Sequence, residues 1–146
     1  MINSVSLSWL HEAVTWLLAP ALFALVVACA IAAVEAGIAV GERFSGLSRL
    51  AAGGDLLHLQ TLARHRLERA DLLARIPPML GLMATIIPLG PGLAALGQGD
   101  PAQLAAAVTV AFDATVLGLV AGIAGLVIGK LRRRWYEEVL ERMEAA

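Results

Sequence analysis

Three long apolar stretches divide the chain, and polar residues collect between and after them. The stretches run over residues 13–40, 76–96 and 102–129. Each is long enough to cross a hydrocarbon core of about 30 Å as a helix, which takes roughly 20 apolar residues. Only residues 97–101 separate the last two stretches, which leaves room for a tight hairpin and nothing larger. The pattern therefore predicts an all-α protein with three transmembrane helices.

The polar segments predict helical extensions outside the bilayer. Residues 1–12 are expected to form a short amphipathic segment at the outer surface. Within residues 41–75, the Gly-Gly-Asp sequence at 53–55 predicts a break followed by a helix N-cap. Leucine and alanine then recur at steps of three and four, which indicates an amphipathic helix with an arginine-rich opposite face. Residues 130–146 are expected to form a charged helical tail on the cytoplasmic side.

All eleven Lys and Arg residues lie in two clusters that flank the apolar stretches. The first cluster comprises Arg43, Arg49, Arg64, Arg66, Arg69 and Arg75, and the second comprises Lys130, Arg132, Arg133, Arg134 and Arg142. Positive charge in short loops is retained on the cytoplasmic side of a membrane. The N-terminus and the 97–101 hairpin carry no Lys or Arg, so both are expected outside and both clusters inside. Three membrane crossings, with the N-terminus outside and the C-terminus inside, agree with the expected side of the N-terminus, the hairpin and both basic clusters.

Composition argues against several classes of protein. The 146-residue chain is 59% hydrophobic and 16% charged, whereas a soluble domain is nearer half apolar and about a quarter charged. The basic clusters flank membrane spans, where retention signals belong, so nucleic-acid binding is a poor interpretation of them. His58 and His65 lie about 10 Å apart along a helix axis, too far for one metal ion to bridge easily. No nucleophile–base pair or phosphate loop is present. We therefore expect no enzyme activity, cofactor or metal site.

Small residues and prolines set the packing of the last two stretches. A stripe of small residues follows one side of the third stretch and consists of Ala107, Ala111, Ala114, Gly118, Ala121 and Gly125. Small residues let helix backbones approach closely in lipid. One such stripe could serve inside a three-helix bundle, and surplus small faces would favour an oligomer. In the second stretch, Pro77 and Pro78 suit a first helical turn. Pro88 and Pro91 each remove a backbone hydrogen bond, so the helix either bends there or ends near Gly90.

Few polar groups lie within the apolar stretches. Thr85 and Thr115 fall near the midpoints of two antiparallel spans, so both hydroxyls are expected at one level; alternatively, each bonds only its own i−4 carbonyl. Placing an ionised carboxylate such as that of Asp113 at the centre of a membrane helix costs about 2.5–3.5 kcal/mol on insertion scales, so Asp113 is a functional candidate. The alternative is a protonated, structural side chain bonded to Thr109. Asp113 and Thr115 lie about 200° apart around the helix and cannot face one pore. Glu35, near the inner end of the first stretch, is expected to reach the lipid headgroups.

Two motifs resemble the MotA/TolQ/ExbB proton channel family. Residues 77–85, Pro-Pro-Met-Leu-Gly-Leu-Met-Ala-Thr, resemble its second pore helix, typically Pro-Leu-Leu-Gly-Leu-Leu-Gly-Thr. Residues 111–119, Ala-Phe-Asp-Ala-Thr-Val-Leu-Gly-Leu, resemble its third, usually Ala-Leu-x-Thr/Ala-Thr-x-x-Gly-Leu. The resemblance implies a homopentamer around an axial pore. Such a pentamer holds two copies of a single-span ExbD-, TolR- or MotB-like subunit that carries a transmembrane Asp.

The resemblance also assigns roles to individual residues. It implies that Thr85 and Thr115 form a polar ring next to the partner's carboxylate, and Asp113 is a further candidate for the ion pathway. The residues expected to shape the helix packing and the pore are Gly81, Pro88, Pro91, Gly118 and Gly122. Ala84 departs from the family pattern, which usually has Gly before the Thr.

The function implied is that of the pore-forming subunit of a proton-motive-force-driven 5:2 motor in the cytoplasmic (inner) membrane. Such a subunit conducts protons together with the partner's Asp and moves the partner. Two alternatives stay open from the residues alone. One is a membrane assembly or anchoring protein without an ion pathway, and the other is a small transporter gated by Asp113.

Overall fold

A computed structural model describes residues 4–41 and 56–144 of the chain. This part consists of three α-helices, α1 (Ser4–Gly41), α3 (Leu56–Gly97) and α4 (Pro101–Glu144). Each helix contains a stretch long and apolar enough to cross a membrane, namely Glu12–Gly41, Ala63–Gly97 and Pro101–Val139. The all-helical, three-span architecture predicted from the hydrophobic pattern is confirmed. Arg43, Arg49 and the predicted N-cap at 53–55 lie outside the described residues.

The helices are longer than the apolar stretches that predicted them. α1 runs without interruption through residues 12 and 13, where the outer segment was expected to meet the first span. α3 joins the arginine-rich segment and the second span in one helix, and it contains both Pro88 and Pro91. It ends at Gly97, so the alternative in which this helix stops near Gly90 is wrong. A helix can accommodate proline inside a membrane because neighbouring helices and local adjustments satisfy the freed carbonyls.

A short turn joins α3 to α4 and is built from residues suited to it. Gly99 has a φ of 86°, a left-handed conformation that glycine adopts without steric cost. Asp100 caps α4, because its carboxylate accepts hydrogen bonds from the backbone N–H groups of Ala102 and Gln103 at 3.1 and 3.2 Å. Pro101 occupies the first helical position, where a missing N–H has no consequence. The turn therefore fixes α3 and α4 as antiparallel neighbours.

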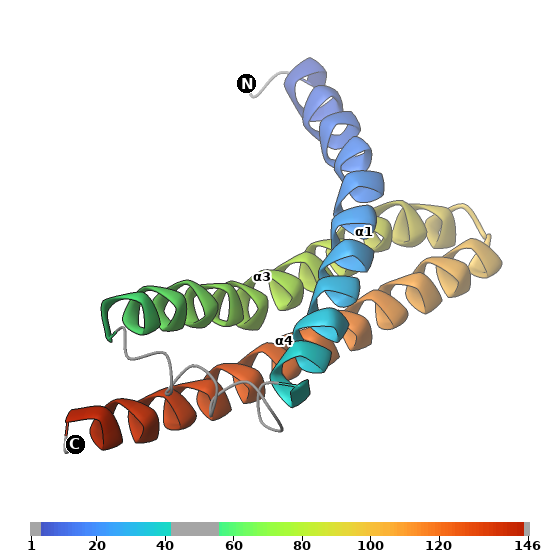
Figure 1. The fold of residues 1–146 in the computed structure, drawn as a ribbon. Coiled ribbons are helices and arrows are strands. Elements are labelled where there is room, and N and C mark those ends of the chain that lie inside the picture. The colour runs from blue at the N-terminus through green and yellow to red at the C-terminus, as the bar shows by residue number, and fades with distance from the viewer. Residues whose placement is uncertain (1–3, 42–55, 145–146) are drawn as a thin grey trace.

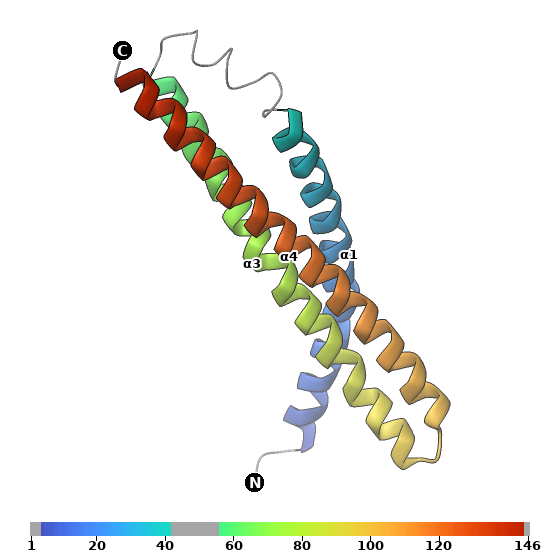
Figure 2. The same cartoon turned by 90° about the horizontal axis from the view of Figure 1, so that it is seen from below.

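The α3–α4 hairpin forms the body of the molecule, and α1 crosses it. α3 and α4 run side by side in both views, whereas α1 crosses them at an angle and its N-terminal part extends away from the hairpin (Figures 1 and 2). The start of α3 and the end of α4 lie at the same end of the hairpin. We call this the basic end, because it carries Arg64, Arg69, Arg75, Lys130, Arg133 and Arg134.

The core consists of layers to which each helix contributes one residue. The layers are Leu25, Ala84 and Ala114; Ala32, Leu73 and Ala121; and Ala39, Ala70 and Ile128. On α1 and on α4 these positions recur at every seventh residue, which is the repeat of helices packed in a left-handed supercoil. Alanine dominates the layers because close helix packing in lipid depends on dispersion contacts between backbones.

Candidate functional site

Two threonine hydroxyls meet between the membrane helices α3 and α4. The Oγ1 atoms of Thr85 and Thr115 are hydrogen-bonded to each other, and both side chains are partly buried. Thr85 Oγ1 also lies 2.7 Å from the carbonyl oxygen of Gly81, and Thr115 Oγ1 lies 2.9 Å from that of Ala111. Thr85 Oγ1 is 3.4 Å from the Ala111 carbonyl oxygen as well. Back-bonding to the i−4 carbonyl and contact between the helices therefore occur together.

The pair lies on the side of the hairpin that α1 does not cover. Around α3, Leu80 and Ala84 pack against α1, and Gly81 contacts α4. Thr85 follows Ala84 by one residue, or about 100°, and it bonds to α4 at Ala111 and Thr115. The same geometry applies to α4, where Ala114 is buried in the layer with α1 and Thr115 comes next. We call the side of the hairpin opposite α1 the open face.

Apart from the two hydroxyls, the middle of the open face is apolar. Helical geometry places large side chains within about 60° of the threonines, among them one on α3 and three on α4. These four side chains are exposed in the single chain, and they are Leu82, Phe112, Leu119 and Leu126. The threonines are thus a single polar position on an otherwise hydrophobic wall.

Glycines bring the two helices close enough for the hydroxyls to meet. A Cβ atom on Gly81 would lie 3.0 Å from the Ala114 carbonyl oxygen, and one on Gly118 would lie 2.6 Å from the Pro77 carbonyl oxygen. On Gly122 it would lie 2.5 Å from Pro78 Cγ. A Cβ at any of these positions would force the neighbouring atoms to shift, so the close approach depends on glycine. The small stripe of α4 is therefore packed against α3, and in part against α1, within one chain.

Asp113 lies away from the threonine pair. It is exposed on α4 and makes no hydrogen bond or ion pair with the residues that the structure describes. The expected alternative partner, Thr109, donates instead to the Ala105 carbonyl at 3.0 Å. Because Asp113 and Thr115 are about 200° apart on the helix, the carboxylate does not point onto the open face.

A buried ion pair near the basic end ties α1 to α4. Arg132 Nη1 donates to Glu35 Oε2 at 2.7 Å, and the Arg132 side chain is fully buried. Glu35 is 7% exposed, so the expectation that it reaches the lipid headgroups is wrong. Arg132 belongs by sequence to the basic cluster expected to set topology, yet in the structure it is a packed core residue. Pairing explains the burial, because an isolated charge would be too costly there.

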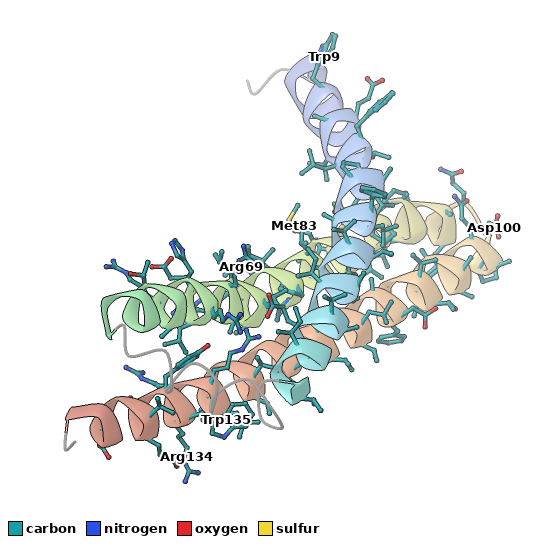
Figure 3. All side chains as sticks on the ribbon, viewed as in Figure 1. Trp9, Arg69, Met83, Asp100, Arg134 and Trp135 are labelled. Carbon is teal, nitrogen blue, oxygen red and sulfur yellow. The ribbon has the colours of Figure 1, made fainter. Side chains whose placement is uncertain are left out.

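The other predicted topology residues lie at the surface of the basic end. Arg75 pairs with Asp71 at 3.2 Å, and Arg133 pairs with Glu137 at 3.3 Å, in both cases one helical turn apart. Lys130 and Arg134 are exposed. Arg134 and its neighbour Trp135 mark this end of α4 in Figure 3, at the opposite end of the helix from Asp100.

Comparison with known proteins gives a family match over the region that contains the threonine pair. A model of the MotA/TolQ/ExbB proton channel family matches residues 48–145, well over half of the chain. The match includes the described parts of both hairpin helices and the threonine pair, and it leaves out α1. No curated protein and no solved structure matches the chain.

Proposed function

The chain belongs to the MotA/TolQ/ExbB proton channel family, and on this premise we propose that it is the pore-forming subunit of a proton-driven complex in the cytoplasmic membrane. In the proposed assembly, five copies surround two copies of a single-span ExbD-, TolR- or MotB-like subunit that carries a transmembrane Asp. The basic end faces the cytoplasm, because positive charge in short loops is retained there.

The observation that carries this proposal is the hydroxyl pair on the open face. If five open faces surround an axis, Thr85 and Thr115 form one polar belt on an apolar wall. α1 then lies on the outside, where its large apolar side chains meet lipid or a neighbouring subunit. Examples are Phe23 and Val34, which are 72% and 62% exposed.

The belt is suited to hydrogen-bonding a carboxyl group in either protonation state. Each threonine hydroxyl has one hydrogen to donate and two lone pairs to accept with. The pair has two hydrogens and several acceptors within reach, including the carbonyls of Gly81 and Ala111. A hydroxyl that donates to its own i−4 carbonyl can accept a hydrogen bond from the O–H of a partner carboxylic acid. The same hydroxyl can rotate away from that carbonyl and donate to a carboxylate.

The membrane potential is a sufficient source of energy for such a cycle. Each elementary charge that crosses yields about 2.3 kcal/mol per 100 mV. In the proposed cycle a proton enters from outside, binds the partner's carboxylate beside the belt, and leaves to the cytoplasm after the pentamer and its partner shift against one another. Only the proton is transferred in this cycle, and no covalent bond to carbon forms or breaks.

Asp113 takes a different place in this assembly. With Thr115 toward the axis, Asp113 faces a neighbouring helix and not the pore. A carboxylate in the hydrocarbon region needs a partner, and the described residues of its own chain supply none. Its partner is then a hydroxyl, a backbone group or water at a contact between subunits.

Proton flux into vesicles that contain both subunits tests the proposed belt. Thr85→Val and Thr115→Val remove the hydroxyls at nearly constant size. Each is expected to lower flux by about tenfold or more. This loss is smaller than the factor of about 100 or more that a positioned acid–base group contributes, because the hydroxyls only hydrogen-bond the partner's carboxyl group. Thr109→Val is the matched control, because Thr109 is exposed and bonds only its own helix. It should leave flux unchanged.

Copy number provides the second arm of the test. Native mass spectrometry of the purified complex should give five copies of this chain with two of the partner. Normal flux in both belt variants would refute the ion pathway. A monomer or dimer would favour an assembly protein or a transporter that uses Asp113.

A further inference from the structure

A groove between α1 and α3 has one apolar body and one charged end. It encloses about 750 Å³, within the size range of small-ligand sites. The residues along its body are apolar and include Ala28, Ile31 and Val34 from α1 and Leu72, Ile76 and Leu80 from α3. It lies on the α1 side of the hairpin and is therefore separate from the threonine pair.

Arg69 lies at the charged end of this groove. Arg69 lies on the part of α3 that is nearer the basic end (Figure 3). The next residue, Ala70, shares a core layer with Ala39, close to the end of α1. Its side chain is exposed and makes no ion pair with any residue that the structure describes. Glu35 also lines the groove, but its charge is paired with Arg132. The groove therefore presents one uncompensated cation at one end of an apolar channel.

We propose that this groove binds one anionic phospholipid, with an acyl chain between α1 and α3 and the phosphate on Arg69. An arginine forms charge-assisted, bidentate hydrogen bonds with phosphate oxygens. Basic pockets between transmembrane helices at the cytoplasmic border are a recognised setting for anionic headgroups. The site requires only that the chain lies in a bilayer, so it does not depend on the proposed proton pathway.

The charged residues at the depth of Arg69 favour a lipid over a second copy of the chain as the occupant of the groove. A second copy would need a free carboxylate opposite Arg69. The acidic residues of the described chain nearest to this level are Glu35, Glu68 and Asp71, and all three are already paired with arginines. The carboxylates of α4 without an ion pair among the described residues lie at other levels: the nearest toward the basic end, Glu138, is roughly 15 Å from Ile128, and Asp113 is roughly 22 Å from it in the opposite direction. A lipid phosphate supplies the missing charge at the right depth.

Lipid titration of the purified full-length protein tests the site. Bound phosphatidylglycerol and phosphatidylcholine are counted per chain by native mass spectrometry. We expect the wild type to prefer phosphatidylglycerol, and Arg69→Gln to weaken that binding about fivefold, the effect of one basic residue near an anionic lipid. Arg64→Gln makes the same charge change on the same helix, but Arg64 is 84% exposed and paired with Glu68. It should bind like the wild type.

A second variant keeps the test decisive if Arg69→Gln does not fold. Ile31→Trp fills the body of the groove without changing charge and should lower phosphatidylglycerol binding by a similar factor. Equal loss in the Arg69 and Arg64 variants, or no loss in either, would overturn the site. Disulfide cross-linking of Leu72→Cys to a second copy of the chain would also overturn it, because that copy would then occupy the groove.

Discussion

The α3–α4 hairpin and α1 are held in the molecule by different kinds of contact. In the hairpin, glycines such as Gly118 and Gly125 bring backbones together, and an added Cβ at either would lie 2.6 Å from backbone atoms of α3. In α1, Gly37 has open space around it. α1 is attached by single layer residues and by the Glu35–Arg132 ion pair. The hairpin thus depends on continuous close packing, whereas α1 depends on a few specific contacts.

This difference corresponds to the extent of the family match, which covers the hairpin and not α1. In the proposed pore, the hairpin must keep its polar groups at a fixed level, and backbone-to-backbone packing fixes the register of α3 against α4. In the same proposal, α1 is an outer helix that must only remain docked. The buried charges of Glu35 and Arg132 favour the docked position in which they are paired, because either charge alone would be costly at this depth.

The largest expected effect comes from breaking the ion pair. Arg132→Met leaves the buried carboxylate of Glu35 without a partner, which costs about 3–5 kcal/mol when one member of a buried pair is removed. The free energy of unfolding is measured by SDS titration of the protein in mixed micelles, followed by far-UV circular dichroism. The loss should appear mainly as early detachment of α1, reported by a cysteine cross-link between α1 and α4.

A variant that replaces both charged residues separates the contribution of the ion pair from that of side-chain packing. Glu35→Met combined with Arg132→Met replaces both charges by apolar side chains and should regain most of the lost stability, because hydrophobic replacements of buried pairs are often neutral or stabilising. If Arg132→Met alone cost under about 1 kcal/mol, the Glu35 carboxylate would not be held in a buried site between α1 and α4.

A smaller effect is expected from adding a methyl group within the hairpin. In Gly118→Ala the new Cβ would lie 2.6 Å from the Pro77 carbonyl oxygen, so the helices must separate. Overpacking of this kind costs about 1–3 kcal/mol. Separation should also weaken the Thr85–Thr115 contact, so proton flux should fall together with stability in the SDS titration.

Gly37→Ala is the matched control on α1. A Cβ atom added to Gly37 would have no atom within 4 Å outside its own stretch of helix. The substitution should therefore be neutral or stabilise the helix by up to about 1 kcal/mol. Equal destabilisation by the two substitutions would contradict the view that only the hairpin requires close backbone approach.

Local pattern in the sequence was enough to predict part of this structure. Hydrophobic length predicted three spans, the residues Gly-Gln-Gly-Asp-Pro predicted the turn, and span midpoints placed Thr85 and Thr115 at one level. The path of α3 through Pro88 and Pro91 stayed open, because packing against α4 decides whether a proline ends a membrane helix or is accommodated.

The Glu35–Arg132 pair was missed because its members are 97 residues apart and each had a local explanation. A signal was nevertheless present. Glu35 follows the buried residues Ala21 and Ala28 at intervals of seven, and Arg132 follows Gly125 of the small stripe by seven. When two opposite charges continue the spacing of buried residues on two helices, and lie at the same end of both, an ion pair between them is the expected interpretation.

The smallest effect is expected from an ion pair of the same chemistry at the surface. Arg64 Nε lies 3.2 Å from Glu68 Oε1, but the side chains are 84% and 57% exposed. Exposed pairs one helical turn apart contribute about 0.3–0.5 kcal/mol, because water screens the charges and ordering the side chains costs entropy. Arg64→Ala should therefore change the unfolding free energy by no more than about 0.5 kcal/mol, and added salt should remove even that difference. A loss as large as that of Arg132→Met would mean that net charge, and not the buried contact between α1 and α4, sets the stability of the basic end.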